Sequence, residues 1–180
     1  MNILAVIPAR ENSKRIPNKT LRLVNNHPLI YYVIKNALES KYINRIIVTT
    51  NSKEIEIVCE QLGVECLIRD PQLCTDDTTL DAVVYDVAKR IECDYVVTLQ
   101  PTSPLLKVES LDRAIEKIIS DKLDTLISVV NYPRLRWIKD DSGVVPTYKE
   151  RVNSQYLKPH YQETGAFIIS KKEVTTDKSR

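Results

Sequence analysis

The sequence predicts a three-layer α/β fold, in which helices cover both faces of a mostly parallel, twisted sheet. Short runs of Val, Ile and Leu alternate along the chain with amphipathic segments of helical period. The first run, Ile3 to Ile7, is apolar throughout, as in strands that are buried on both faces. Strands that alternate with helices require right-handed crossovers, and these build a parallel sheet. The length of 180 residues, 43% of them hydrophobic, suits one domain over 1–180.

The first half of the chain contains three expected strands, 3–7, 46–48 and 64–68, and two expected helices, 29–38 and 53–62. The first strand stops at Pro8, and Pro28 stands where a helix start tolerates proline. Leu29 and the apolar residues after it recur at helical spacing and predict one buried helix face. Gly63 follows the second helix in a position typical of helix C-termini.

The second half continues the alternation and then loses it. We expect helices over 80–91 and 111–119 and strands over 95–99 and 125–130. After Val130 the chain has prolines at 133, 146 and 159 and shorter strand-like pieces such as 165–169, which predict short antiparallel additions at the sheet edge. The polar segment 171–180 matches no element.

Composition excludes several functions. The 26 Lys and Arg nearly balance 24 Asp and Glu, so the net charge of +2 gives no reason to expect a nucleic-acid partner. Only Gly63, Gly143 and Gly165 are glycines, so neither a P-loop nor a G-x-G-x-x-G dinucleotide motif exists. With only His27 and His160, a multi-histidine zinc site is excluded.

The cysteines and the N-terminal residues indicate a cytoplasmic protein. Cys59, Cys66, Cys74 and Cys93 form no C-x-x-C pair, and buried free thiols are favoured over a zinc site. The chain opens without the pattern of a signal peptide. Since no apolar run approaches the ~20 residues that cross a bilayer, we expect a soluble protein without a membrane partner.

Candidate binding residues follow the strands at their carboxyl ends, where open parallel sheets bind ligands. These residues are Arg10, Asn12, Ser13, Lys14, Arg15 and Lys19 after the first strand, Asn51 after the second, Arg69 after the third, and Gln100, Thr102 and Ser103 after the fourth. Four of them are cations within ten residues, opposed only by Glu11. This local positive field suits a triphosphate, although a solvated basic loop is the alternative.

Acidic residues offer a second, weaker pattern. Asp76, Asp77 and Asp81 resemble a metal cluster, but acids are also favoured at a helix N-terminus, and we prefer the helix-start interpretation. Asp140 and Asp141 before Ser142 and Gly143 predict a turn. Arg134 and Arg136 stand just before Trp137 in the sequence, close enough to form a carboxylate pocket with it. Packing at the sheet edge is equally compatible.

Four segments together resemble one known family. IPARENSKRIPNK at 7–19 is similar to the CTP-binding motif of the CMP-sialic acid synthetases, the N-acylneuraminate cytidylyltransferases. IVTTN at 47–51, RDPQL at 69–73 and LQPTSPL at 99–105 follow in the family's order, and TGA at 164–166 is a weaker match to N-G-A. The resemblance implies a Rossmann-like nucleotidyltransferase that transfers CMP from CTP to a nine-carbon 2-keto sugar acid and releases pyrophosphate.

The resemblance also implies roles for the candidate residues. Lys19 and Arg10 would be catalytic, and Gln100, Thr102, Ser103, Arg134 and Arg136 would bind the sugar acid. The predicted nucleotide-binding residues are Ala9, Arg10, Asn12, Ser13, Lys14, Lys19, Asn51, Arg69 and Thr79. The family's Arg after Q-P-T-S-P-L is Leu106 here, and its Y-R-x-N-G-A has Gln162 and Thr164 in place of Arg and Asn. Both departures concern the sugar pocket.

Cofactor, assembly and exact substrate are further expectations from the resemblance. It implies Mg²⁺ or Mn²⁺, whose family ligands, an aspartate pair in a D-I-D-T-like segment, are not found in this chain. It implies a homodimer, with 131–170 as a dimerisation or sugar-site extension. Legionaminate and pseudaminate are alternative acids; Kdo is a weaker one, because Kdo enzymes resemble L-Q-G-D-E-P at the fourth strand. A non-catalytic nucleotide-binding module is the alternative outside enzymes.

Overall fold

The computed structural model describes residues 1–11 and 16–180. The chain divides into two compact units, of which the first contains Met1–Ile127 and Gly165–Arg180 and the second contains Ser128–Thr164. The second unit begins within the expected strand 125–130 and covers most of the segment where the sequence loses its regular alternation. The two units are described separately below.

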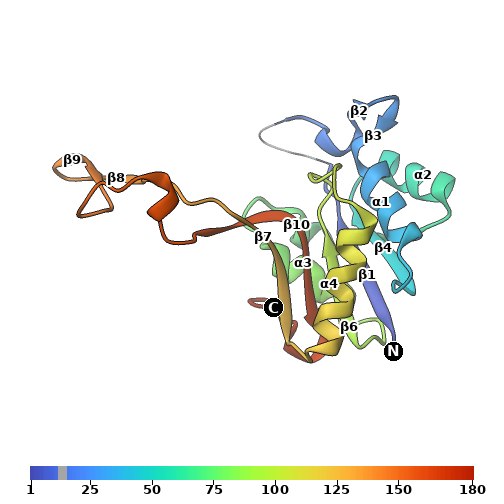
Figure 1. Cartoon of the computed structure of the whole chain (residues 1–180). Coiled ribbons are helices and arrows are strands. Elements are labelled where there is room, and N and C mark those ends of the chain that lie inside the picture. The colour runs from blue at the N-terminus through green and yellow to red at the C-terminus, as the bar shows by residue number, and fades with distance from the viewer. Residues whose placement is uncertain (12–15) are drawn as a thin grey trace. The chain divides into compact units, whose positions relative to one another are not determined.

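A six-stranded sheet forms the centre of the first unit, in the order β5-β4-β1-β6-β10-β7 (Figure 1). The strands are β1 Ile3–Pro8, β4 Arg45–Thr50, β5 Glu65–Ile68, β6 Tyr95–Leu99, β7 Thr125–Asn131 and β10 Tyr161–Lys171. The pairs β1–β4, β4–β5 and β1–β6 are parallel, whereas β10 runs antiparallel to β6. The predicted three-layer α/β fold with antiparallel strands toward one edge is therefore confirmed.

Four α-helices connect these strands: α1 Leu29–Glu39, α2 Lys53–Leu62, α3 Leu80–Ala88 and α4 Val108–Ser120. Short 3₁₀ helices lie at Lys19–Leu21, Pro71–Cys74 and Lys172–Val174, and β2 Leu23–Val24 pairs with β3 His27–Pro28. The α3 helix ends before the expected residue 91 because Arg90 and Ile91 donate to carbonyls three residues back, as in a 3₁₀ turn. Gly63 ends α2 with φ +68°, as its position predicted.

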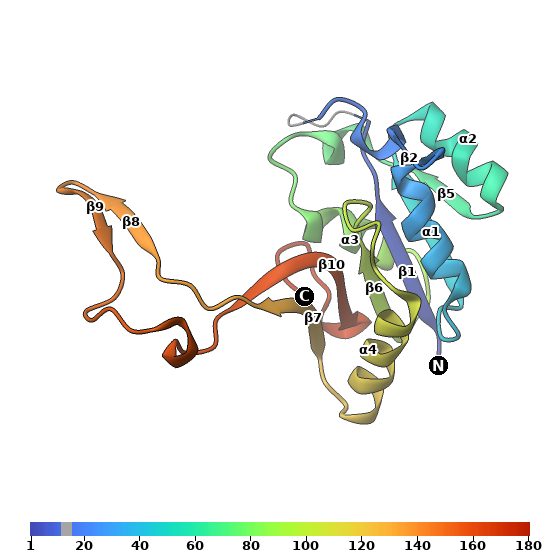
Figure 2. The same cartoon turned by 45° about the horizontal axis from the view of Figure 1, so that its top comes forward.

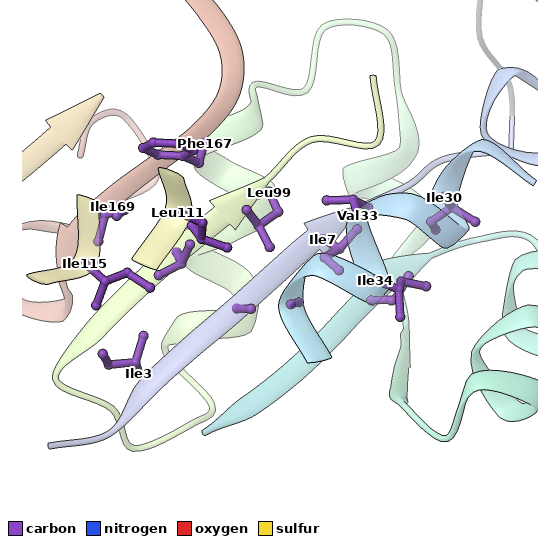
Figure 3. Packing of buried hydrophobic residues seen from close by; sticks show 14 of the residues in the cluster. Ile3, Ile7, Ile30, Val33, Ile34, Leu99, Leu111, Ile115, Phe167 and Ile169 are labelled. Atoms are coloured by element: carbon purple, nitrogen blue, oxygen red, sulfur yellow. The ribbon is translucent and has the colours of Figure 1, made fainter. Parts of the chain in front are cut away.

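Alternation of side chains along the strands creates two hydrophobic cores, one on each face of the sheet. Ile3, Ala5 and Ile7 of β1 pack with α1, α2 and α4 (Figure 3). Leu4 and Val6 point to the other face and pack against α3. Figure 2 shows α1 and α4 in front of the sheet and α3 behind it. Helices on both faces are the condition for a parallel sheet buried on both sides.

The connections reverse direction between β1 and β6. From β1 the chain passes through α1 to β4 and through α2 to β5, moving toward one edge of the sheet. It then returns through α3 on the opposite face to β6, which pairs with the other side of β1. The carboxyl ends of β1 and β6 thus form the topological switch point, where open α/β sheets bind ligands.

The thiols differ in environment. All four cysteines are free, but only Cys59 is buried, and burial raises its pKa to about 12. Cys66, Cys74 and Cys93 are partly exposed, so the prediction of buried thiols was wrong for these three. No helix within residues 1–11 and 16–180 is long and apolar enough to span a bilayer.

The second unit contains a small hairpin, in which β8 Trp137–Asp140 pairs with β9 Gly143–Pro146. Asp140 accepts a hydrogen bond from the Ser142 backbone N–H at 2.8 Å, so the predicted turn is present. Trp137 packs edge-on against Tyr148 with ring centroids 6.0 Å apart. No residue of 128–164 is buried. Within itself, this unit builds no hydrophobic core.

Candidate functional site

A polar cavity of about 250 Å³ opens at the switch point. Its walls come from the ends of β1 and β6, the 3₁₀ helix at Lys19–Leu21 and the start of α3. The predicted site residues that line it are Ala9, Arg10, Lys19, Arg69, Thr79, Gln100 and Thr102. Residues that are separated by up to 93 positions in sequence therefore meet, because the parallel strands end at one edge of the sheet.

Other predicted residues lie elsewhere. The Asn51 side chain accepts a hydrogen bond from the Glu11 backbone N–H at 3.0 Å and so holds the loop after β1. Ser103 donates its backbone N–H to the Gln100 carbonyl in a turn. Neither residue lines the cavity. Asn12, Ser13 and Lys14 lie outside the described residues.

The second unit holds the two remaining predicted residues. The Arg134 guanidinium lies 4.6 Å from the centroid of the Tyr132 ring, a cation–π contact within that unit. Arg136 accepts a hydrogen bond at its carbonyl from the Thr147 backbone N–H. The role of both residues in sugar binding stays a prediction.

Arg69 is a buried cation in the wall of the cavity. Only 5% of the residue is exposed, and its guanidinium donates to the Thr49 carbonyl at 2.7 Å and to the Thr49 hydroxyl at 3.4 Å. Burial lowers the pKa of Arg69, and the nearby charge of Arg10 lowers it further. No carboxylate in the described part of the chain pairs with it. A buried charge without a counter-ion favours an anionic ligand.

Arg10 sits at the end of β1 and is already engaged. Its guanidinium lies 3.1 Å from the Asp76 carboxylate and donates to the Thr75 carbonyl at 3.3 Å. The helix-start interpretation was wrong for Asp76, because Thr79 caps α3 and Asp81 is the acid of its first turn. Sequence reasoning missed Asp76 as a pocket residue. Its position seven residues after Arg69, in the loop that follows the third strand, was the available signal.

Lys19 supplies the third cation of the cavity. It opens the 3₁₀ helix at Lys19–Leu21, which follows Asn18 in a left-handed conformation with φ +50° and is anchored by the buried Thr20. Within the described residues, Lys19 makes no ion pair. Lys19 thus adds a positive charge to the lining of the cavity.

Gln100 directly follows β6 and lines the cavity. Its backbone N–H donates to the Ala166 carbonyl at 3.3 Å, so β10 fixes the strand end. Gly165 adopts φ +71°, and a Cβ there would lie 3.5 Å from the Gln100 Nε2 atom. The Gln100 side chain makes no hydrogen bond in the part of the chain that the structure describes, so its donors and acceptor are available to a ligand.

Metal-ligating side chains do not cluster among the described residues. No group of three or more His, Cys, Asp and Glu side chains comes together among residues 1–11 and 16–180. Asp76 is the single carboxylate that lines the cavity, and Arg10 already pairs with it. Because Mg²⁺ at phosphate sites is usually held by one or two carboxylates together with substrate phosphates and waters, the expected metal stays a prediction.

The pattern of cations around a cavity at the switch point agrees with one family. The Cytidylyltransferase family model matches residues 4–173. The chain belongs to the cytidylyltransferase family.

Curated relatives of this cytidylyltransferase have several sugar acids in their names. The N-acylneuraminate cytidylyltransferase of Streptococcus agalactiae is 32% identical, over 96% of this chain and 44% of that protein. The CMP-N,N'-diacetyllegionaminic acid synthase of Legionella pneumophila is 41% identical over 64% of this chain and 53% of that protein. The pseudaminic acid cytidylyltransferase of Campylobacter jejuni is 33% identical over 94% and 78%. The chain spans about half the length of the first two relatives.

A solved structure shares the fold. A CMP:2-keto-3-deoxy-manno-octonic acid synthetase complexed with CTP superposes with a TM-score of 0.75, at 17% identity, over 97% of this chain and 76% of that one. At this identity the likeness concerns the fold alone, which is that of a nucleotidyltransferase.

Proposed function

We propose that this cytidylyltransferase transfers CMP from CTP to an N-acylneuraminate-like nine-carbon 2-keto sugar acid and releases pyrophosphate. The observation that carries the proposal is the cavity at the switch point, lined by Arg10, Lys19 and Arg69 against one carboxylate, Asp76. This surplus of cations suits the triphosphate of CTP, since guanidinium and ammonium groups bind phosphate strongly. Family membership supports cytidine as the nucleoside.

The reaction is a displacement at phosphorus. The anomeric hydroxyl oxygen of the sugar acid attacks the α-phosphorus of CTP and loses its proton, while the bond from that phosphorus to the pyrophosphate oxygen breaks. Negative charge then grows on the departing pyrophosphate. Lys19 and Arg10 would stabilise this charge, and Arg69 would hold the nucleotide from its buried position in the wall.

The sugar acid would bind beside Gln100 and Thr102. The unbonded Gln100 amide offers two donors and one acceptor, which match hydroxyl and N-acyl groups. Arg134 and Arg136 would hold the sugar carboxylate. A metal-assisted reaction stays an expectation from the family resemblance, and no step above depends on a metal.

Legionaminate is the second candidate acid, favoured by the 41% identity to the legionaminic acid synthase. Pseudaminate and Kdo are the acids of other relatives. We also propose a homodimer and a cytoplasmic location, the second supported by the free cysteines.

Calorimetry with CTP followed by a pyrophosphate-release assay tests the proposal. CTP should bind more tightly than UTP or ATP, and pyrophosphate should appear only when an acid of the correct kind is added. Assays with N-acetylneuraminate, legionaminate, pseudaminate and Kdo in parallel identify the acid. Binding of CTP without release in any assay would favour a non-catalytic nucleotide-binding module, and absence of CTP binding would refute the proposal.

A further inference from the structure

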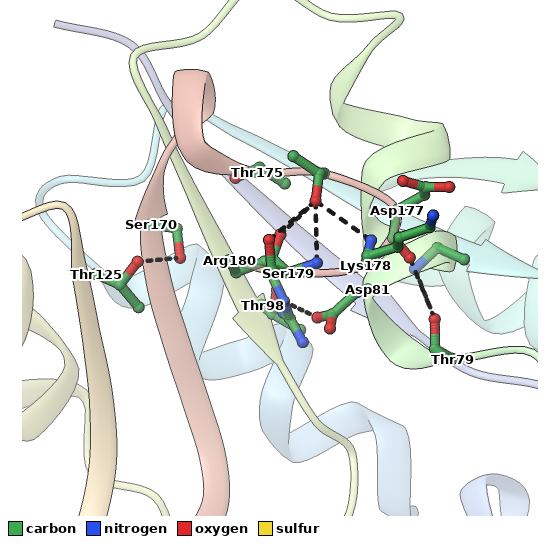
Figure 4. Close-up of polar contacts among 12 residues, drawn as sticks. Thr79, Asp81, Thr98, Thr125, Ser170, Thr175, Asp177, Lys178, Ser179 and Arg180 are labelled. Atoms are coloured by element: carbon green, nitrogen blue, oxygen red, sulfur yellow. Dashed lines mark hydrogen bonds and ion pairs between the residues drawn. The ribbon is translucent and has the colours of Figure 1, made fainter.

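The segment that matched no element in the sequence folds against α3 and β6 within the first unit. After the 3₁₀ helix at Lys172–Val174, the Thr176 hydroxyl accepts the backbone N–H groups of Lys178 at 3.2 Å and Ser179 at 3.0 Å (Figure 4). A hydroxyl that accepts two N–H groups in this way closes a tight turn. Thr175 is buried and its hydroxyl donates to the Lys171 carbonyl at 2.9 Å. The turn directs Arg180 toward the sheet.

Arg180 is inserted between α3 and β6. Its side chain is 5% exposed, its Nε atom donates to the Asp81 carboxylate, and another guanidinium nitrogen lies 2.5 Å from the Thr98 hydroxyl (Figure 4). Asp81 belongs to the first turn of α3, and Thr98 is a buried residue of β6. Charge-assisted hydrogen bonds of this kind are stronger than neutral ones and fix geometry. A single side chain therefore joins a helix to a strand.

The two partners of Arg180 lie two residues from residues that line the cavity. Asp81 is two residues after Thr79, which lines the cavity. Thr98 is two residues before Gln100. Because side chains alternate along a strand, Thr98 and Gln100 face the same side of the sheet, the one covered by α3. The Thr79 hydroxyl also lies 3.5 Å from the Asp177 carbonyl. The segment 175–180 thus contacts the start of α3, which carries Thr79, and the strand β6, which precedes Gln100.

The start of α3 has few other anchors. No residue of 70–79 is buried, so the loop that leads into the helix contributes nothing to a core. The first buried residue of α3 is Val83. Loops without apolar contacts open locally at low free energy cost. In the first helical turn, Leu80 packs partly buried against the core that contains Val96 of β6, and the ion pair between Asp81 and Arg180 adds a polar contact.

We propose that Arg180 is a positioning residue of the nucleotide site, which sets the separation between Thr79 and Gln100 by bridging Asp81 and Thr98. Arg180 does not line the cavity, so it acts through these walls rather than on the ligand. This inference rests on the proposed function, because CTP is the ligand whose binding reports the separation.

Calorimetric titration with CTP and amide hydrogen exchange over 75–83 test the bridge. Arg180→Met keeps the length of the side chain and removes its hydrogen bonds, and Lys178→Met is the matched control on the exposed side of the same turn. Arg180→Met should weaken CTP binding about tenfold and speed exchange at the start of α3, because misplaced walls lose contact with the ligand. Lys178→Met should match the wild type in both measurements.

A double variant separates positioning from general destabilisation. Asp81→Asn alone should weaken CTP binding by less than Arg180→Met does, and the two together should weaken it no further than Arg180→Met, since that substitution already removes the contact with Asp81. Thr98→Val removes one arm of the bridge and should give a smaller loss in the same direction, even if Arg180→Met does not fold.

Three outcomes would overturn the inference. Equal CTP affinity of wild type and Arg180→Met would do so even if the melting temperature fell, and so would losses that add in the double variant. A wild-type protein that does not bind CTP would refute the proposed function, and the role of Arg180 with it. The first two outcomes leave the proposed function standing.

Discussion

Lys19, like Arg69, lines the cavity and carries no ion pair within the described residues. An ammonium group that faces developing phosphate charge stabilises the transition state and packs no core. Lys19→Ala should therefore lower turnover by at least ~100-fold with an unchanged melting temperature. Steady-state pyrophosphate release measures this, with Lys41→Ala as the control, since Lys41 is exposed after α1 and does not line the cavity. Turnover near that of the wild type would favour the alternative interpretation, in which Lys19 belongs to a solvated basic loop.

Asp76 competes with the nucleotide for Arg10. Its carboxylate lies 3.1 Å from the guanidinium in a partly exposed pair, the two side chains being 46% and 34% exposed. Because exposed pairs contribute at most about 1 kcal/mol, Asp76→Asn should tighten CTP binding by only about two- to fivefold. Calorimetric titration at low and high salt measures the gain, which should shrink as salt screens the charges. Weaker binding by Asp76→Asn would mean that Asp76 orients Arg10 instead.

For single residues, the sequence predicted the positions of the cavity's cations better than it predicted the groups that contact them. Arg10, Lys19 and Arg69 each follow a strand or the loop after it, and the strand-end rule brought them together. Asp76 was assigned to a helix start, because an acid near a helix N-terminus fits two interpretations until the cap is known. Neither the burial of Arg69 nor the Thr49 carbonyl beneath it has a sequence signal, since both arise from long-range packing.

Among the elements, α2 and α3 offer a matched pair of capping residues. Ser52 accepts the Ile55 N–H at 3.4 Å and Thr79 accepts the Ala82 N–H at 3.1 Å, but only Thr79 lines the cavity. Removing either cap should destabilise the protein by about 0.5–2 kcal/mol. Urea unfolding of Thr79→Ala and Ser52→Ala measures this loss. Thr79→Ala alone should also weaken CTP binding. Equal affinities of the two variants for CTP would show that Thr79 does not contribute to the nucleotide site.

Strands and helices with strong periodicity were predicted closely, whereas the segment after β10 was not. Helix 53–62 and strand 95–99 have the expected bounds because buried residues recur at a clear period. Residues 175–180 carry no periodicity, and their fold depends on the Thr176 hydroxyl and on Asp81, which is 99 positions from Arg180. A turn held by one hydroxyl and a distant carboxylate cannot be read from local sequence.

The whole molecule combines a well-packed unit with one that lacks a core. The order of strands followed from the alternation of elements, because crossover rules leave few arrangements. The second unit follows no such rule, since none of its residues is buried. It nevertheless exposes Ile138, Val144 and Tyr156 to 54%, 66% and 71%. Isolated two-stranded hairpins are marginally stable in water, so this surface favours a partner that covers it.

The proposed partner is a second copy of the chain. Light scattering of the protein should give twice the 20.7 kDa mass of one chain. Ile138→Asp places a charge on the apolar hairpin and should shift the mass toward 20.7 kDa, because a buried unpaired carboxylate opposes association. Ser142→Asp introduces the same charge in the polar turn of the same hairpin and should leave the mass unchanged. Since the first unit builds its own core, its melting temperature should be equal in both variants. A wild-type mass of one chain at micromolar concentration would contradict the dimer. A dimer that persists in Ile138→Asp would show that this hairpin is not part of the interface.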